Sequence, residues 1–140
     1  MNNYSIGIIG HGYVGESQSF AFSPSFNVRV FDKDSSKSTH SLKEVLESNF
    51  IFVCLPTPMK KDGSQDLSYI IDFFNDIKKG PIYIIKSTIV PGTTNMLVSK
   101  YKNLDIIFSP EFLTERTAKL DILTQTRIIL GGNKKLTNKV

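Results

Sequence analysis

The stretch Ile6–Gly15 reads IGIIGHGYVG, and it decides the fold. The apolar run at its start leads directly into the pattern GxGxxG, and a helix can follow over Tyr13–Phe22. In this context Gly10 permits a tight turn, Gly12 lets the backbone approach a pyrophosphate, and Gly15 lets the helix pack closely on a sheet. The helix N-terminus adds N–H groups and the positive end of the helix dipole. The stretch therefore predicts a strand, a phosphate-binding loop and a helix that together hold a dinucleotide.

Short apolar runs recur along the rest of the chain, with turn residues between them. They are rich in Ile, Val and Phe and are continuous rather than alternating, as in parallel strands that are buried on both faces. Six strands are predicted: Ile6–Ile9, Val28–Phe31, Phe50–Leu55, Ile82–Ile85, Asp105–Phe108 and Arg127–Leu130. Six strands match the order 3-2-1-4-5-6 of dinucleotide-binding sheets.

Helical patterns lie between these strands. The clearest helix runs from Leu67 to about Lys78, with Asp66 placed to cap its N-terminus. A shorter helix follows Ser41, where the sequence forms a capping box, and another spans Pro91–Lys100. Strands and helices that alternate in this way predict an α/β fold with a doubly wound parallel sheet (Rossmann fold). We expect a single domain over residues 1–140.

Composition narrows the class of protein. Apolar residues make up 40% of the chain and charged residues 21%, and no run approaches the ~18 apolar residues of a membrane span. The N-terminus lacks a basic segment and the single cysteine excludes an intrachain disulfide, so we expect a cytoplasmic protein that binds no membrane. The net charge is +4, but the three lysine pairs lie far apart, so we expect no nucleic-acid partner. A dianionic dinucleotide explains the positive charge equally well.

The second predicted strand ends in an acidic residue, Asp32. A carboxylate at this position accepts hydrogen bonds from the ribose hydroxyls of the adenosine. It favours NAD over NADP, because a 2′-phosphate beside it would bring two anions together. The alternative is that the glycines only form a turn and that Asp32 only caps a strand.

An ordered series of motifs resembles the UDP-glucose/GDP-mannose dehydrogenase family. The series spans nearly the whole chain and comprises Gly10–Gly15, Val53–Pro58, Asp66–Ser68, Lys86–Thr88 with Pro91–Thr93, Ser109–Leu113 followed by Glu115, and Arg127–Gly132. The resemblance implies oxidation of the 6-hydroxymethyl group of a nucleotide sugar to a carboxylate in two NAD-dependent steps.

The resemblance also implies roles for single residues. The residue that matches Thr57 contacts the cofactor, and the one that matches Thr88 helps to position a water and the reacting sugar. Lys37 matches a lysine that contacts the adenosine in some members, although a solvated loop lysine is the alternative. The implied cofactor-binding residues are Gly10, Gly12, Tyr13, Val14, Gly15, Asp32, Lys37, Thr57, Ser87, Thr88 and Glu115.

The segment from Ser109 begins a turn or a helix, on whose face Glu111 and Glu115 would lie together. The resemblance places both glutamates in the active site and implies that Glu115 acts as an acid/base or orients a water. It also implies that Phe112 and Leu113 contact the sugar through their backbone. The implied catalytic residues are Thr88, Glu111 and Glu115, and no metal site is expected. The alternative is that both glutamates are surface carboxylates.

The chain departs from the family pattern in what it lacks. The second oxidation needs a cysteine with lysine and asparagine partners, which belong to a region beyond this one, as do the central helix and the C-terminal substrate domain. The only cysteine, Cys54, falls in the third predicted strand as a core residue. We therefore expect a cofactor domain that needs a partner chain or a homo-oligomer for turnover of a nucleotide sugar. The alternatives are a non-catalytic NAD-binding or regulatory module and a complete small oxidoreductase of another specificity.

Overall fold

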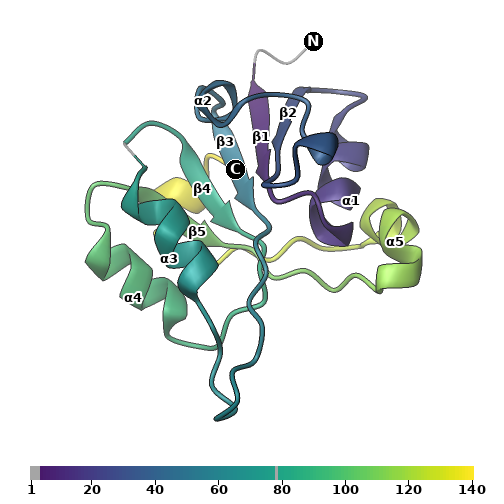
Figure 1. The fold of residues 1–140 in the computed structure, drawn as a ribbon. Helices are drawn as coiled ribbons and strands as arrows, with labels where there is room; N and C mark the ends of the chain where they lie inside the picture. Colours follow the sequence, from purple (N-terminus) through teal and green to yellow (C-terminus); the bar gives the residue numbers. More distant parts are fainter. Residues whose placement is uncertain (1–3, 78) are drawn as a thin grey trace.

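The computed structural model describes residues 4–77 and 79–140. It contains a sheet of five parallel strands with helices on both faces (Figure 1), which confirms the predicted α/β, doubly wound fold. The strands are β1 (Ser5–Ile9), β2 (Asn27–Phe31), β3 (Phe50–Val53), β4 (Ile82–Ile85) and β5 (Asp105–Phe108). The helices are α1 (Tyr13–Phe22), α2 (Leu42–Val45), α3 (Ser68–Asn75), α4 (Thr93–Lys100), α5 (Ala118–Thr124) and α6 (Lys134–Thr137), with 3-10 turns at Ser35–Lys37 and Glu115–Thr117.

The sheet has the order β2-β1-β3-β4-β5. The chain leaves β1 toward one edge to form β2, and from β3 onward it proceeds toward the other edge. In doubly wound sheets the loops at such a switch point diverge, and the crevice at the carboxyl ends of the strands binds ligands. The expected binding crevice therefore lies between β1 and β3.

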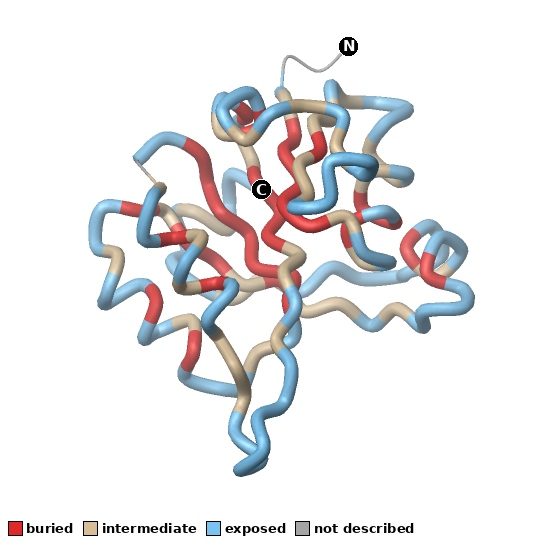
Figure 2. The backbone as a smooth tube through the Cα atoms, viewed as in Figure 1, coloured by how far each residue is buried: buried red, intermediate tan, exposed pale blue. Residues whose placement is uncertain are grey.

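Alternate strand residues enter two separate apolar cores, one on each face. One core contains Ile9 and Tyr83 and is covered by α2, α3 and α4, which supply Val45, Phe74 and Leu97 among others. The other contains Ile8 and is partly covered by Phe22 of α1 and by Leu136 of α6. Figure 2 shows the strands as mostly buried between these layers. Burial on both faces is the reason that the strand sequences are continuously apolar.

The sixth predicted strand was wrong. The segment Arg127–Leu130 has no strand structure, and only Gly131 pairs with Phe108, as an isolated antiparallel bridge with N···O distances of 2.8 and 2.7 Å. Ile128 is 70% exposed and Ile129 43% exposed, so this apolar run is not buried on two faces. Its composition resembles that of a strand, but it does not lie in the sheet.

The predicted strand order 3-2-1-4-5-6 was also wrong. That order requires a strand outside β2, whereas β2 is an edge strand here. The link from Asp32 to Phe50 contains only a 3-10 turn and the one-turn helix α2. The Ser41 capping box on α2 is confirmed, because the Ser41 and Glu44 side chains each accept a hydrogen bond from the other residue's backbone N–H. So short a link leaves no room for an additional strand.

The remaining helices agree with the sequence in most respects. The predicted helix from Leu67 is α3, and the Asp66 carboxylate accepts a hydrogen bond from the Ser68 N–H at 2.9 Å, although Leu67 is the N-cap residue. Lys78, where this helix was predicted to end, lies outside the described residues. Within residues 4–77 and 79–140, every helix is too short or too polar to cross a bilayer.

Residues 109–114, which follow β5, have no regular secondary structure. Glu111 accepts a hydrogen bond from the Leu113 N–H at 2.6 Å, and helical structure begins only at Glu115. The Ser109 hydroxyl accepts a hydrogen bond from Lys86 rather than capping a helix. Glu111 and Glu115 therefore do not share a helix face, and that expectation was wrong.

Candidate functional site

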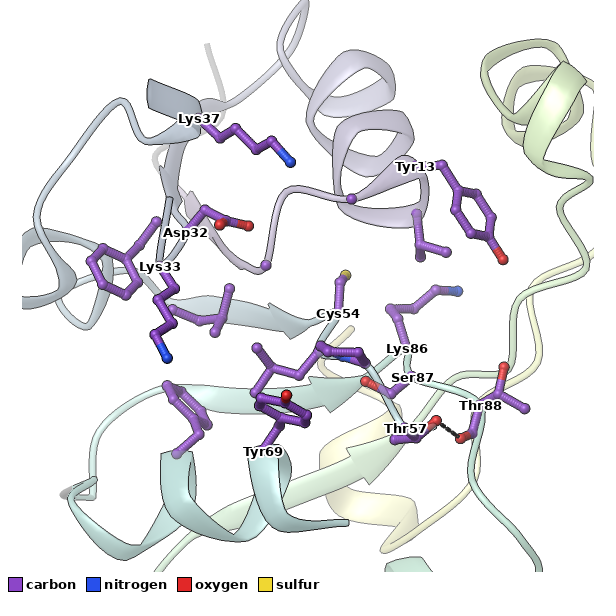
Figure 3. A pocket seen from close by; sticks show the side chains of 18 of the residues that line it. Tyr13, Asp32, Lys33, Lys37, Cys54, Thr57, Tyr69, Lys86, Ser87 and Thr88 are labelled. Atoms are coloured by element: carbon purple, nitrogen blue, oxygen red, sulfur yellow. Dashed lines mark hydrogen bonds between the residues drawn. The ribbon is translucent and has the colours of Figure 1, made fainter. Parts of the chain in front are cut away.

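A cleft of about 640 Å³ opens at the carboxyl edge of the sheet, where the strand order reverses. Its volume lies within the range of small-molecule sites. Figure 3 shows its walls, which come from the ends of four strands, the loop before α1 and the start of α3. Among the residues singled out in the sequence, the cleft brings together Gly10, Gly12, Tyr13, Val14, Asp32, Lys37, Thr57, Ser87, Thr88 and Glu111. Residues far apart in the chain thus meet at the expected crevice.

Each of the three loop positions holds a glycine for a different structural reason. Gly10 has a φ of +88°, and a Cβ atom there would lie 2.5 Å from the Cys54 carbonyl oxygen. A Cβ at Gly15 would lie 2.0 Å from the Gly10 carbonyl oxygen, so α1 approaches the loop too closely for any side chain. A Cβ at Gly12 would meet nothing within 4 Å. Gly12 therefore leaves space beside the start of α1, whereas Gly10 and Gly15 hold the loop in shape.

The N-terminus of α1 has the properties of an anion site. Gly12 is its N-cap residue, and no side chain caps the helix. The N–H groups of the first turn therefore remain available to a bound anion, and the helix dipole favours negative charge there. Tyr13 and Val14, in this first turn, both line the cleft.

Asp32 lies at one end of the cleft, directly after β2. Its carboxylate accepts hydrogen bonds from the His11 N–H at 2.6 Å and from the Asp34 N–H at 2.8 Å. These contacts fix the carboxylate beside the glycine loop. Lys37 lines the same end of the cleft, from the 3-10 turn that follows (Figure 3).

The loops after β3 and β4 are joined at the other end. The Thr57 hydroxyl donates to the Thr88 carbonyl oxygen at 2.6 Å, and the Gln65 side-chain amide donates to the same oxygen at 2.8 Å (Figure 3 shows the first bond). Gln65 also accepts from the Val90 N–H at 3.2 Å. Sequence reasoning missed Gln65, because a glutamine in a polar loop carries no distinctive signal. Its amide fixes the backbone that carries Thr88.

Lys86 is a second residue to which the sequence analysis assigned no role, although it belongs to one of the motifs. It is only 7% exposed, and its ammonium donates to the Ser109 hydroxyl and the Pro110 carbonyl oxygen at 3.3 Å each. Burial lowers the pKa of this lysine. The signal was its position directly after the apolar run of β4, where a lysine, a residue seldom buried, follows four buried residues.

Cys54 lies just after β3 rather than inside a longer strand, and it lines the cleft. Burial raises the pKa of its thiol to about 12; the positive charge of Lys86 acts against this shift, and the Glu111 carboxylate adds to it. At neutral pH the group is therefore a thiol, which is a poor nucleophile. The structure thus gives a reason for the expected inertness of Cys54, although the predicted strand was too long.

The structure separates the residues assigned to catalysis and substrate. Glu111 lines the cleft, but Glu115 lies in a neighbouring depression that it shares with Tyr13. Burial raises the pKa of the Tyr13 hydroxyl, and the charges of Glu111 and Glu115 add to this effect. Phe112 and Leu113 line a third hollow, outside the cleft. Tyr13 therefore borders both the cleft that contains Glu111 and the depression that contains Glu115.

A further hollow of about 650 Å³ lies on the α1 side of the sheet. Phenylalanine side chains from α1 and β3, including Phe22 and Phe52, line much of it. No residue of the glycine loop lines it, nor do Asp32 and Thr88, whereas Lys86 borders both this hollow and the cleft. The carboxyl-edge cleft is therefore the candidate site.

Comparison with known proteins gives the family. Residues 35–140 match the NAD binding domain of the UDP-glucose/GDP-mannose dehydrogenase family. An uncharacterised protein of Methanocaldococcus jannaschii is 31% identical over 96% of the chain, and UDP-glucose 6-dehydrogenase of Rickettsia conorii is 35% identical over 66% of it. A UDP-glucose dehydrogenase structure from Pyrobaculum islandicum superposes with a TM-score of 0.81 over 97% of the chain, at 22% identity.

The matches cover most of this chain but only a small part of each relative. The chain spans 19% and 23% of the two curated relatives, and 42% of the Pyrobaculum structure. The matched family range begins after the glycine loop, but the structural superposition includes nearly the whole chain. The chain belongs to the UDP-glucose/GDP-mannose dehydrogenase family and corresponds to its NAD-binding domain.

Proposed function

We propose that the chain is the cofactor half of a nucleotide-sugar 6-dehydrogenase, which binds NAD along the carboxyl-edge cleft and needs a partner chain or a second copy for turnover. The observation that carries this proposal is the cleft itself. A carboxylate at one end, an uncapped helix N-terminus in the middle and a group of polar residues at the other end match the three parts of a dinucleotide. The family's NAD-binding domain supports the same assignment.

Each part of the cleft has a distinct task in this proposal. Asp32 accepts hydrogen bonds from the adenosine ribose, and Lys37 lies beside it. The first turn of α1 binds the pyrophosphate, and Gly12 lets the phosphates approach the backbone. The nicotinamide then extends toward Ser87 and Thr88. When bound, NAD supplies the hydride acceptor.

The chemistry at this far end rests on Glu111 and Thr88. Glu111 can accept a proton from the sugar hydroxyl, either directly or through a water held by Thr88. Burial raises the pKa of Cys54 and leaves it as a thiol, so the thiolate that the second oxidation needs must come from another polypeptide segment. A partner that supplies this nucleophile would also hold the sugar.

A non-catalytic NAD-binding module is the second candidate function. The observation that favours it is the position of Glu115, the residue expected to act in catalysis, which lies outside the cleft. Phe112, which was expected to contact the sugar, is also outside the cleft and exposed. Cofactor binding without turnover, in every mixture with candidate partner chains, would support this module over the half-enzyme.

Replacing Asp32 by alanine tests the cofactor assignment. We expect wild-type chain to bind NAD more tightly than NADP in calorimetry. We expect Asp32→Ala to weaken NAD binding by about 10- to 100-fold, because hydrogen bonds to a charged group contribute ~1.5–3 kcal/mol. The preference over NADP should disappear with the carboxylate.

The matched control is Asp62→Ala, which removes an exposed carboxylate from the hairpin between β3 and α3, outside the cleft. It should leave both affinities unchanged. Equal affinity of the wild-type chain for NAD and NADP, or an Asp32→Ala variant that binds like wild type, would overturn the ribose assignment.

The isolated chain is expected to make no UDP-glucuronate from UDP-glucose and NAD. Hydride transfer requires the sugar to be held near the nicotinamide, and such orientation can contribute ~7–11 kcal/mol. The measurement follows NADH by absorbance and the sugar by mass spectrometry. Sustained production of UDP-glucuronate by this chain alone would contradict the half-enzyme proposal.

A further inference from the structure

Lys86 carries a buried positive charge that no carboxylate neutralises directly. It is 7% exposed, and among the described residues the ion pairs are Arg29 with Glu47 and Lys119 with Glu16, neither of which involves it. Its two hydrogen-bond partners, Ser109 and the Pro110 carbonyl, are uncharged. A buried ammonium with only neutral partners costs stability. Groups of this kind gather at functional sites, where their charge acts on a ligand.

The position of Lys86 relates that charge to the cleft. It follows β4 directly and lies next to Ser87 and Thr88, where it borders both the cleft, at the end opposite Asp32, and the hollow on the α1 side of the sheet. Figure 3 shows its side chain extending in the direction of Tyr13, away from Asp32 and Lys37. An ammonium has three N–H donors, and the two protein hydrogen bonds use two of them.

We propose that Lys86 makes the cleft discriminate between the two redox states of the cofactor, so that it binds NADH more tightly than NAD⁺. This inference rests on the proposed function, in which the nicotinamide lies at the Ser87 and Thr88 end. The nicotinamide ring carries a positive charge when oxidised and none when reduced. An ammonium held nearby in a poorly solvated wall repels only the oxidised ring.

The groups that face Lys86 do not cancel this effect. Cys54 is an uncharged thiol at neutral pH, because burial raises its pKa to about 12. Glu111 is the carboxylate whose charge acts on Lys86, but the two side chains form no ion pair within 4.0 Å. Glu111 therefore offsets part of the repulsion. At an effective dielectric constant of ~20, charges ~6–8 Å apart still interact by more than the thermal energy.

Discrimination between the redox states has a consequence for the reaction. A tenfold preference for NADH corresponds to about 1.4 kcal/mol. It raises the reduction potential of the bound cofactor by about 30 mV, because two electrons are transferred. Bound NAD⁺ thus becomes a stronger oxidant, which favours oxidation of an alcohol within the complex.

The test measures the dissociation constants of NAD⁺ and NADH for four proteins by calorimetry at neutral pH. Lys86→Met removes the charge and keeps a side chain of similar length, and it should reduce the NADH preference about tenfold. Glu111→Gln removes the partly compensating carboxylate and should increase that preference by about threefold. The control Lys37→Met removes a charge at the adenosine end and should change both affinities equally. Opposite shifts for Lys86→Met and Glu111→Gln are specific to charge, because loosened packing would weaken both cofactors together.

A second measurement needs no substitution. Burial lowers the pKa of Lys86 below that of an ordinary lysine, so the wild-type preference for NADH should decline as the pH rises above neutral. The pKa of the Tyr13 hydroxyl, toward which Lys86 extends, is raised instead. A preference that neither Lys86→Met nor rising pH changes would overturn the role of Lys86, while leaving the proposed function intact. Failure of wild-type chain to bind either cofactor would overturn the proposed function instead. If Lys86→Met does not fold, the pH series and Glu111→Gln decide.

Discussion

Gly15→Ala is expected to destabilise the whole chain. The added Cβ would lie 2.0 Å from the Gly10 carbonyl oxygen and 3.2 Å from the Ile8 side chain. Both neighbours belong to the sheet or to the tight loop after it, so neither can move without displacing β1. Helix α1 would have to leave the sheet. We expect the free energy of unfolding to fall by about 3 kcal/mol, the upper end for an overpacked site.

Urea denaturation followed by circular dichroism measures this loss. The matched control is Gly80→Ala, at a position where an added Cβ meets nothing within 4 Å. Its unfolding free energy should stay within ~0.5 kcal/mol of wild type. Equal urea midpoints for Gly15→Ala and wild type would contradict the close contact between α1 and the loop.

Gly12→Ala should strongly weaken cofactor binding while it leaves the fold intact. Gly12 has a φ of −76°, which any residue can adopt, and an added Cβ would meet nothing within 4 Å. The folded chain therefore accommodates alanine without strain. The methyl group would occupy the space through which the pyrophosphate approaches the start of α1. We expect NAD affinity to fall on the order of 100-fold, which is about 2.7 kcal/mol.

The pair Gly12→Ala and Gly15→Ala separates binding from folding. Calorimetry with NAD gives the affinity, and urea denaturation gives the stability of the same preparations. Gly12→Ala should lose affinity at unchanged stability, whereas Gly15→Ala should lose stability. Undiminished NAD binding by a folded Gly12→Ala variant would mean that the phosphates do not pass this loop.

Local sequence patterns predicted those parts of the fold that depend on neighbouring residues. The Ser41 capping box and the close contact between Gly15 and Gly10 are of this kind. The close approach of Gly10 to Cys54, in contrast, depends on β1 lying beside β3. The sixth strand failed because an apolar run such as Arg127–Leu130 reports composition, whereas sheet membership depends on partners elsewhere in the chain. The link from Asp32 to Phe50 is short, but its consequence, that β2 forms an edge, depends on the sheet order.

The candidate site was predictable at those positions where a residue type, in its sequence context, indicates one main function. Asp32 and the glycines fall into this class, and the cleft contains Asp32, Gly10 and Gly12 as expected. Gln65 was not predictable, because its importance arises from hydrogen bonds across loops. The sequence offered a signal for Lys86 in its place after β4, but its burial and its hydrogen bonds depend on the fold. Roles for Glu115, Phe112 and Leu113 stay predictions, since these residues lie outside the cleft in this structure.

The most direct test of the account is a titration of the isotopically labelled chain with NAD, followed by two-dimensional NMR of the backbone amides. The cleft predicts large shifts at Gly12, Val14, Asp32 and Thr88, and small ones in the hollow that contains Phe22. Shifts that cluster around Phe22, or a spectrum that saturating NAD leaves unchanged, would contradict the claim that the carboxyl-edge cleft binds the dinucleotide.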